Sequence, residues 1–238
     1  MTERLFLTDP RLKCAKAVVL TANRNGIILD RSVFYARSGG QPGDRGVLRW
    51  EGGETPIVEA VKGEDDAILH IVAASAMLPP EGTTVEAEID WPRRYRLMRM
   101  HTAMHLLCSL LPGAGVTGGQ VGEAHSRLDF DLRESPDRAA LEAGLAMLIA
   151  ADHPVTWEWV DESILDSSPE LVRTLSVKPP RGSGRVRLVR IGAGDPPVDL
   201  QPCGGTHVAS TGEIGTITVQ KIENKGRQNR RVVIALAA

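Results

Sequence analysis

Residues 90–113 read DWPRRYRLMRMHTAMHLLCSLLPG, and this stretch decides how the chain is divided. Asp90 is a residue type that caps helices, and Pro92 suits the first turn of a helix. Apolar residues then recur every three or four positions, as on one face of a helix, until Pro112-Gly113 ends the pattern. The sequence therefore predicts a helix that begins near residue 91 and ends before residue 112.

The chain before this helix has the pattern of a small β-barrel. Short apolar runs alternate with turn pairs such as Asn25-Gly26 and Gly52-Gly53. Many short strands with frequent turn signals are typical of a barrel. The predicted strands are residues 15–20, 26–29, 46–50, 56–61, 67–72 and 83–89. We expect residues 1–90 to form a β domain that contains a glycine-rich motif.

The chain after residue 90 mixes helices and strands. A second helix is expected to start at Ser135, with Pro136 in its first position, and to run to about Ala151. The Gly- and Pro-rich stretch from Lys178 to Gly184 is expected to be an exposed loop. The predicted strands are residues 155–160, 185–191, 215–220 and 231–236. The chain as a whole is therefore predicted to be of the α+β class, with a domain boundary near residue 91.

Composition limits the kind of protein. The 238 residues carry 28 Lys and Arg against 30 Asp and Glu, a net charge of −2, which argues against a general nucleic-acid coat but allows a local basic surface. Three cysteines do not form a disulfide framework and suit a reducing compartment. No signal-peptide pattern and no apolar run of about 20 residues is present. We expect a cytoplasmic protein with no membrane partner.

Two pairs of residues suggest a metal site. His101 and His105 are four residues apart, so a helix places them on one face. Cys203 and His207 have the same spacing in a later loop, where two glycines let the backbone turn tightly. Three imidazoles and one thiolate are a ligand set that zinc takes in tetrahedral geometry. The sequence predicts one zinc ion per chain, held by these four residues.

The role of that zinc ion has two interpretations. Four protein ligands are typical of a closed, structural site, whereas a catalytic zinc keeps one position open. A zinc-bound water with a pKa lowered to about 7 is a nucleophile at neutral pH. We expect a zinc-bound water as the catalytic group and assign no protein base. The alternative is a metal that organises the site and holds the substrate.

Two further features suit contact with RNA. Gly39, Gly40 and Gln41 belong to a glycine loop that is either a turn between barrel strands or a backbone surface close to a substrate. Basic residues of the C-terminal region and of the first helix either face solvent or contact phosphates. These basic residues are Arg93, Arg94, Arg96, Arg99, Lys221, Lys225, Arg227, Arg230 and Arg231.

Together these motifs resemble the alanyl-tRNA editing family, which comprises the editing domain of alanyl-tRNA synthetase and the free-standing AlaX proteins. The shared features are the His-x-x-x-His helix, the later Cys-x-x-x-His, and Phe34-Tyr35 followed by Gly39-Gly40-Gln41-Pro42-Gly43-Asp44. The length and the leading domain resemble the medium-sized AlaX type. The resemblance implies a small β-barrel domain over residues 1–90 and a two-layer α/β sandwich editing domain over residues 91–238.

The resemblance also implies a reaction and its partner. The expected activity is that of a zinc-dependent aminoacyl-tRNA deacylase acting in trans on the acceptor end of mischarged tRNA(Ala), chiefly seryl-tRNA(Ala), with glycyl-tRNA(Ala) as a second candidate. Thr117 and Gln120 match positions near the amino-acid pocket. Contacts to tRNA are expected from Arg230, Arg231, Gly39, Gly40 and Gln41. No ATP-binding motif is present, so no ATP is expected, and the sequence does not predict the oligomeric state.

Three other functions fit part of the pattern. Another zinc-dependent ester hydrolase needs the metal ligands but no RNA-binding surface. A zinc-stabilised RNA-binding module without catalysis needs all four ligands to close the site. An editing domain for threonyl-tRNA shares a related metal pattern, but the glycine-motif domain argues against it.

Overall fold

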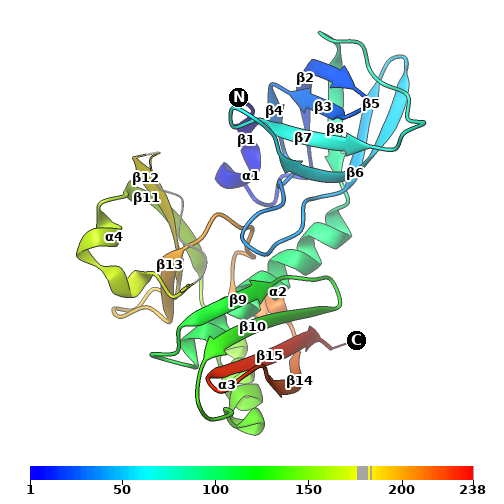
Figure 1. Ribbon diagram of the computed structural model, residues 1–238. Helices are drawn as coiled ribbons and strands as arrows, with labels where there is room; N and C mark the ends of the chain where they lie inside the picture. The colour runs from blue at the N-terminus through cyan, green and yellow to red at the C-terminus, as the bar shows by residue number, and fades with distance from the viewer. Residues whose placement is uncertain (176–181, 183, 238) are drawn as a thin grey trace. The chain divides into compact units, whose positions relative to one another are not determined.

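The structure is a computed structural model that describes residues 1–175, 182 and 184–237 (Figure 1). The chain forms two compact units, Met1–Arg96 and Leu97–Ala238, and each is described by itself. The predicted loop from Lys178 to Gly184 lies outside the described residues, apart from Gly182 and Gly184. No described helix is long and apolar enough to cross a membrane. The assignment of residues 1–90 and 91–238 to two functional domains stays a prediction.

The first unit contains a closed antiparallel barrel in the order β2-β3-β7-β6-β5-β8. Its strands are β2 (Cys14–Asn23), β3 (Gly26–Leu29), β5 (Gly46–Trp50), β6 (Gly53–Lys62), β7 (Ile68–Val72) and β8 (Thr84–Ile89). Every second residue of β8 enters the core, as a barrel strand requires. A short parallel pair, β1 (Glu3–Arg4) with β4 (Arg31–Ser32), and the one-turn helix α1 (Leu5–Thr8) complete the unit. The predicted α+β class with an N-terminal barrel is confirmed.

The glycine loop contains a two-residue hairpin turn. Ser38 and Gln41 exchange backbone hydrogen bonds of 3.1 and 2.9 Å, and the two residues between them have φ of +54° and +83°. Positive φ at both central positions defines a type I′ turn and favours glycine. Gln41 is fully buried, whereas Gly39 and Gly40 are exposed. Gly43 is required for another reason, because a Cβ there would lie 1.9 Å from the carbonyl oxygen of Ala60.

A buried ion pair joins the glycine loop to the start of the next helix. The Nε of Arg94 donates to both carboxylate oxygens of Asp44, at 3.0 and 2.9 Å. Its other nitrogens donate to the carbonyls of Pro10 and Val33, and Asp44 also accepts from the amide of Tyr35. Both charged groups are therefore saturated with hydrogen bonds, which a buried ion pair needs to be tolerated.

Helix α2 (Trp91–Ser109) begins where the sequence predicts it. The carboxylate of Asp90 accepts from the amide of Arg93 at 3.1 Å, as a helix cap does. The expectation that the arginines of its first turns form one phosphate-binding surface is wrong for Arg93 and Arg94. Both are buried, and Arg93 donates to the carbonyl of Gly43. Desolvated arginines that bond backbone carbonyls cannot be told from surface arginines by charge pattern alone.

The second unit contains an antiparallel sheet in the order β14-β15-β10-β9. Its strands are β9 (Val116–Gln120), β10 (His125–Asp131), β14 (Ile217–Asn224) and β15 (Asn229–Leu236). Helix α3 (Arg138–Ala150) packs against β14 and forms a second layer. The predicted two-layer α/β arrangement is confirmed (Figure 1).

A smaller antiparallel sheet in the order β11-β12-β13 belongs to the same unit. Its strands are β11 (Val155–Asp161), β12 (Arg185–Ile191) and β13 (Asp199–Pro202). One face packs Val186 and Leu188 against Leu165, in a cluster covered by α4 (Ile164–Ser167) and the 3₁₀ turn η1 (Pro169–Leu171). A second 3₁₀ turn, η2 (Thr211–Ile214), precedes β14.

Some element boundaries differ from the predictions. Helix α3 begins at Arg138 and not at Ser135, because the side chain of Asp137 accepts from the amide of Ala140 at 2.7 Å and caps it. Strand β14 begins two residues later than predicted, since Gly215 has a φ of +71° that a strand cannot adopt. Strands β9, β10 and β13 were not predicted. Strand β9 is rich in glycine, and β13 is four residues long and ends in proline, so both lack a strong β signal.

His70, in the barrel core, provides a test of this fold by pH. Its Nδ1 donates to the carbonyl of Ile27 at 2.9 Å, and its Nε2 accepts from the hydroxyl of Ser32 at 2.8 Å. Burial lowers the pKa of His70 to about 4, against 6.5 for an ordinary histidine. The unfolded chain therefore binds a proton that the folded barrel excludes, and stability is lost as pH falls from about 6.5 towards 4.

We expect His70 to lower the free energy of unfolding by about 3 kcal/mol between pH 7 and pH 4. Urea unfolding of the wild type and His70→Gln at both pH values measures this effect. The difference in free energy of unfolding between the two proteins should fall by about 3 kcal/mol from pH 7 to pH 4. His125→Gln, which replaces an exposed histidine on β10, is the control and should show no such narrowing. An unchanged gap between wild type and His70→Gln would contradict the neutral buried imidazole.

Candidate metal centre

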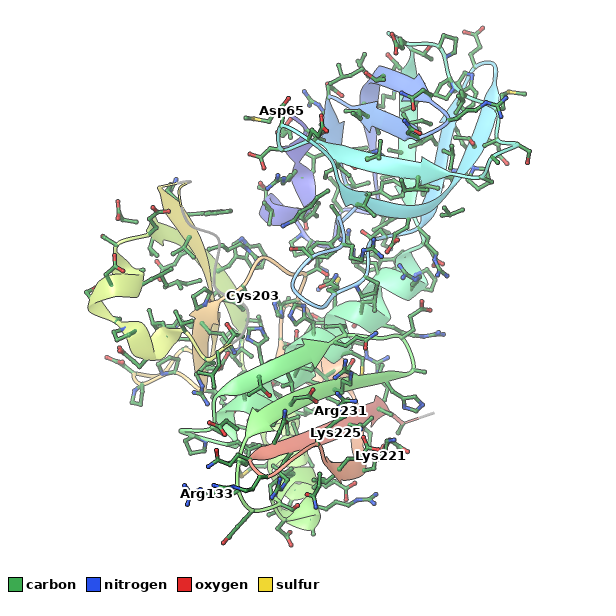
Figure 2. All side chains as sticks on the ribbon, in the orientation of Figure 1. Asp65, Arg133, Cys203, Lys221, Lys225 and Arg231 are labelled. Atoms are coloured by element: carbon green, nitrogen blue, oxygen red, sulfur yellow. The ribbon has the colours of Figure 1, made fainter. Side chains whose placement is uncertain are left out.

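The four predicted ligands come together in the second unit. His101 and His105 project from one face of α2, and Cys203 and His207 belong to the segment that follows β13. One ligand atom from each residue lies within 4.8 Å of the others. The three histidines are buried, and Cys203, labelled in Figure 2, is partly buried. The cluster has the composition and convergence needed to hold a metal ion.

The orientation of His105 is fixed by β13. The Nδ1 of His105 lies 2.8 Å from a carboxylate oxygen of Asp199, which also accepts from the side-chain amide Nε2 of Gln201 at 2.9 Å. A carboxylate can only accept, so Nδ1 carries the hydrogen and Nε2 is left as the ligand atom. This imidazole–carboxylate pair is a common support of metal-binding histidines.

Thr102 fixes the tautomer of His207. Its single hydroxyl hydrogen is donated to the carbonyl of Met98 at 3.0 Å. The same oxygen lies 3.1 Å from Nδ1 of His207 and accepts from the amide of Val208 at 3.3 Å. Because the hydroxyl has no second hydrogen, Nδ1 of His207 must be the donor. Nε2 of His207 is therefore directed to the cluster as a hydrogen-free acceptor.

The loop that carries Cys203 is held by Arg187 of β12. Its Nη1 donates to the carbonyls of Cys203 and Gly205 at 2.9 and 3.0 Å. The sulfur lies 3.4 Å from Nε2 of His207 and 3.6 Å from Nε2 of His101. It also accepts from the amide of Gly205 at 3.4 Å. These contacts hold the sulfur facing two of the three imidazoles.

The electrostatics of the cluster favour a thiolate. Burial raises the pKa of Cys203, but the electrostatic effect of His101 and the hydrogen bonds from His101 and His105 outweigh burial and bring this pKa well below its ordinary value. Burial also lowers the pKa of His105, yet its bonds to Asp199 and Cys203 prevail and raise it to about 10. Burial, with the neighbouring His101, lowers the pKa of His207 to about 3. Metal ions bind a thiolate and neutral imidazoles, so a metal ion that binds here must displace the proton that the raised pKa leaves on His105.

The residues expected to contact the amino acid lie on β9. The hydroxyl of Thr117 donates to the carbonyl of Asp129 at 3.1 Å, and the side-chain oxygen of Gln120 accepts from Arg127 at 3.3 Å. A Cβ on Gly119, between them, would lie 3.5 Å from Cε of Met104 on α2. Strand β9 therefore approaches the helix turn between the two histidines. The substrate contacts of Thr117 and Gln120 stay predictions.

The structure places the basic C-terminal residues differently from the expectation. Arg230 is 8 % exposed and donates to the carbonyls of Gly226, Asn229 and Arg133, so its guanidinium stabilises the β14–β15 turn. Arg231 forms two hydrogen bonds to the carboxylate of Asp129, at 2.7 and 2.8 Å. The basic side chains labelled in Figure 2 are Arg133, Lys221, Lys225 and Arg231.

The two labelled lysines are also paired with an acid. Lys221 and Lys225 both contact Glu223, at 2.9 and 3.4 Å. Together with the Arg231–Asp129 pair, these contacts neutralise much of the charge on this part of the sheet. The density of basic residues in the sequence therefore overstates the positive charge that this surface offers to phosphates.

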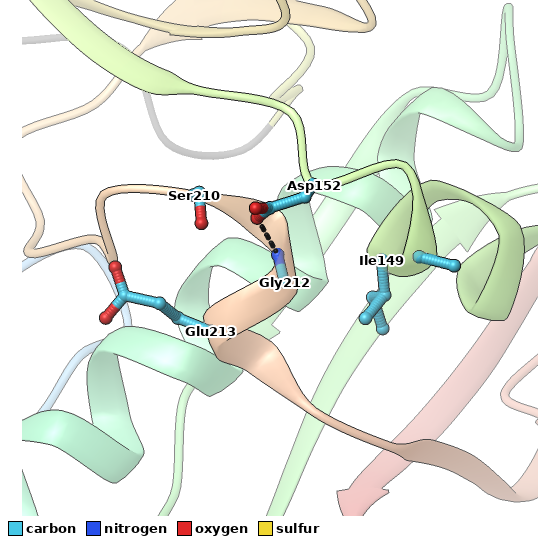
Figure 3. A pocket seen from close by; sticks show the side chains of 6 residues that line it. Ile149, Asp152, Ser210, Gly212 and Glu213 are labelled. Atoms are coloured by element: carbon cyan, nitrogen blue, oxygen red, sulfur yellow. Dashed lines mark hydrogen bonds between the residues drawn. The ribbon is translucent and has the colours of Figure 1, made fainter.

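A shallow pocket of about 530 Å³ lies elsewhere in the second unit (Figure 3). Its lining residues are Ile149, Ala150, Asp152, Ser210, Gly212 and Glu213. The carboxylate of Asp152 accepts from the amide of Gly212 at 2.9 Å and from the hydroxyl of Ser210, and these bonds lower its pKa. Asp152 therefore joins the end of α3 to η2, and we assign it a structural role.

Thr102, Arg187, Asp199 and Gln201 support the cluster but were not predicted. One signal was available for two of them, because Asp199 and Gln201 alternate along the residues that lead to Cys203. Alternation places them on one face of a strand. The roles of Thr102 and Arg187 depend on contacts with residues distant in the sequence, which spacing does not indicate.

Comparison with known proteins agrees with this fold and cluster. Residues 186–233 match the family model described as threonyl and alanyl tRNA synthetase second additional domain, and residues 8–93 match that of class II (A) tRNA synthetases. The chain is thus of the class of proteins that share segments with tRNA synthetases. It is 37 % identical over 248 residues to the alanyl-tRNA editing protein AlaX-M of Methanosarcina acetivorans, covering 99 % of each chain.

A second editing protein AlaX-M, from Saccharolobus solfataricus, is 34 % identical over 236 residues, covering 98 % of each chain. The chain belongs to the AlaX-M family of alanyl-tRNA editing proteins. It is also 38 % identical over 232 residues to the alanine–tRNA ligase of Pyrobaculum aerophilum. That match covers 93 % of this chain but 25 % of the ligase, so the chain spans about a quarter of the ligase's length.

The support of His207 by Thr102 gives a testable prediction. Thr102→Val removes the acceptor for Nδ1 of His207, and we expect affinity for Zn²⁺ as a probe ion to fall by roughly 10- to 100-fold. Competition with a chromophoric chelator at neutral pH measures the affinity.

Thr102→Ser restores the hydroxyl and should recover most of the loss. Thr156→Val, at an exposed position of β11, is the matched control. Thermal melts of the metal-free variants separate a loss of affinity from a loss of folding. Equal Zn²⁺ affinity of Thr102→Val and the wild type would contradict the tautomer assignment.

Proposed function

We propose that this protein hydrolyses the ester bond between the amino acid and the terminal adenosine of mischarged tRNA(Ala). Seryl-tRNA(Ala) is the chief substrate, and glycyl-tRNA(Ala) is the second. The observation that carries this proposal is the convergence of His101, His105, Cys203 and His207 in a chain that aligns along nearly its whole length with AlaX-M proteins. The protein acts in trans, in the cytoplasm, on the acceptor end of tRNA. Ester hydrolysis needs no nucleotide, so we expect no ATP requirement.

The metal ion we propose is zinc, one per chain. Borderline and soft donors, three imidazoles with a thiolate, suit zinc better than magnesium or calcium, which prefer oxygen ligands. The hydrogen bonds to Asp199 and Thr102 keep a hydrogen on Nδ1 of His105 and His207, so Nε2 is the ring nitrogen that would bind zinc. When bound, zinc supplies positive charge that polarises a carbonyl or lowers the pKa of water.

The chain's own residues have three tasks in this proposal. Gln201 donates to Asp199, which holds His105, while Thr102 holds His207 and Arg187 holds the Cys203 loop. Burial of the histidines keeps bulk water from the ligands. Such support fixes ligand geometry before the substrate arrives, which avoids reorganisation during the reaction.

Selectivity is assigned to β9. Serine differs from alanine by one hydroxyl group, and a pocket made to hydrogen-bond this hydroxyl discriminates better than an apolar one. Thr117 is the proposed partner of the serine hydroxyl, and Gln120 is a second pocket residue. For tRNA contact we retain Arg231 and the exposed pair Gly39-Gly40. We do not retain Arg230 and the side chain of Gln41, because both are buried.

One observation favours a second candidate function. All four donors lie within 4.8 Å of one another, and this closeness suits a closed structural zinc site. A zinc-stabilised RNA-binding module without catalysis would have the same cluster. A zinc-dependent hydrolase of other esters is a further alternative. Measurements of activity and of RNA binding distinguish the three.

The main experiment is a deacylation panel with seryl-, glycyl- and alanyl-tRNA(Ala) and seryl-tRNA(Thr). We expect the wild type to hydrolyse the first two and to spare alanyl-tRNA(Ala). Cys203→Ala and the chelator-treated protein should lose at least about 100-fold in rate, since a lost ligand should cost no less than a lost ligand support. Cys14→Ala, at an exposed cysteine of β2, is the matched control.

Hydrolysis of none of these substrates would overturn the proposed function. Metal-dependent RNA binding without hydrolysis would establish the RNA-binding module in its place. Hydrolysis of simple esters, with no preference for aminoacyl-tRNA, would indicate the general zinc hydrolase. Preferred hydrolysis of seryl-tRNA(Thr) would assign the activity to threonyl-tRNA editing.

Thr117 provides a separate test of selectivity. Thr117→Val keeps the shape of the side chain and removes its hydroxyl group. We expect the preference for seryl- over alanyl-tRNA(Ala) to fall by about 3- to 10-fold, the value of one hydrogen bond. The ratio of kcat/KM for the two substrates measures it, with a thermal melt to show that the fold is retained. An unchanged ratio would exclude Thr117 from recognition of the serine hydroxyl.

A further inference from the structure

Strand β11 is an edge strand, and its tryptophans share a face with the supports of the metal cluster. Directly opposed residues of an antiparallel pair lie on the same face of the sheet. Trp157 is opposite Val189, which is opposite Gln201. Trp159 is opposite Arg187, whose carbonyl accepts from the amide of Cys203 at 3.0 Å. One row of residues therefore runs from the Cys203 ligand through Arg187 to Trp159.

Exposure rises along this row towards the edge of the sheet. Arg187 is 3 % exposed, and its Cζ lies 4.9 Å from the ring centre of Trp157. Trp159, one position further along the strand face, is 41 % exposed. Across the parts of the chain that the structure describes, no other Phe, Tyr or Trp side chain is as exposed as that of Trp159. The cluster around Leu165 packs on the opposite face of the sheet, so that core does not need Trp159.

The charges around Trp159 nearly balance. Arg185 donates to the carbonyl of Trp159 at 2.9 Å and is opposite Asp161, which is on the same face. Arg187 is directed towards the Cys203 loop. This surface therefore offers an aromatic ring and little net charge. Such a surface suits the face of a nucleobase better than a run of phosphates, since stacking depends on the aromatic ring.

The distance from Cys203 to Trp159 also fits the last nucleotides of a tRNA acceptor end. Two strand spacings separate the backbones of Cys203 and Trp159, which is about 9.6 Å. A base within one or two nucleotides of an ester held at the cluster can span this separation. The geometry points to Trp159 as a stacking platform for a base in the single-stranded acceptor end of tRNA. This inference rests on the proposed function and adds where the RNA end is held.

The test uses the full chain and deacylated tRNA(Ala) whose terminal adenine is replaced by 2-aminopurine. Stacking quenches this fluorophore, and a penultimate-position label covers the neighbouring base. We expect quenching with the wild type and with Trp159→Phe, and its loss with Trp159→Leu and Trp159→Ala. Binding should weaken about tenfold on loss of the ring, the effect of one base–aromatic stack. The salt dependence of binding should stay unchanged, because no phosphate contact is removed.

Glu158→Ala is the matched control, since Glu158 is the neighbouring residue of the same strand and faces the other side. It should leave quenching and affinity unchanged. In deacylation of seryl-tRNA(Ala), Trp159→Leu should raise KM about tenfold and leave kcat within about twofold. If Trp159→Ala does not fold, the comparison of Trp159→Leu with Trp159→Phe still shows whether quenching requires an aromatic ring at position 159.

Each outcome bears on one claim. Equal quenching at both labelled positions in the wild type and Trp159→Leu would overturn the platform, and an active wild type would then leave the proposed function intact. No deacylation by the wild type, with quenching that depends on Trp159, would overturn the function but not the RNA contact. A change in oligomeric state of Trp159→Leu by light scattering, with unchanged quenching, would assign the edge strand to contact with a second copy.

Discussion

The second unit brings three buried imidazoles and the partly buried sulfur of Cys203 close together, and the rest of this unit has to stabilise these polar groups. Buried polar groups are costly unless each has a partner. Asp199 and Thr102 supply partners on the outer sides of two imidazoles, and Gly205 supplies an amide to the sulfur. The inner sides are left to face one another. A metal cation fits such an arrangement, because it can bind the three ring nitrogens and the sulfur at once.

The two residue pairs of the cluster were predictable because each depends on local spacing. A four-residue separation has a fixed meaning on a helix, so His101 and His105 could be placed on one face without knowledge of the fold. The barrel was predictable for a similar reason, since turn residues such as Asn25-Gly26 and Gly52-Gly53 separate its strands. Strand β9 was not predictable, because Gly118 and Gly119 are there to admit neighbouring side chains and give no strand signal.

The arginines show where local reasoning fails. Arg93, Arg94 and Arg230 belong to stretches dense in positive charge, which in an unfolded chain favours contact with phosphate. In the fold each donates to backbone carbonyls, and Arg94 also binds a buried carboxylate. Whether a guanidinium faces solvent or carbonyls depends on chain segments up to 97 residues away, as in the Arg230–Arg133 contact. A charge pattern contains no information about such partners.

The side chain of Arg187 makes two kinds of contact, hydrogen bonds to backbone carbonyls and a contact with an aromatic ring. Its N–H groups bind the carbonyls of Cys203 and Gly205, and its planar guanidinium lies over the ring of Trp157. Lysine carries the same charge on a compact ammonium group that has no such plane. Arg187→Lys would therefore keep the charge but lose the contact of the guanidinium with Trp157. Among sequences that keep this arrangement, position 187 should vary less than its burial or its charge alone would suggest.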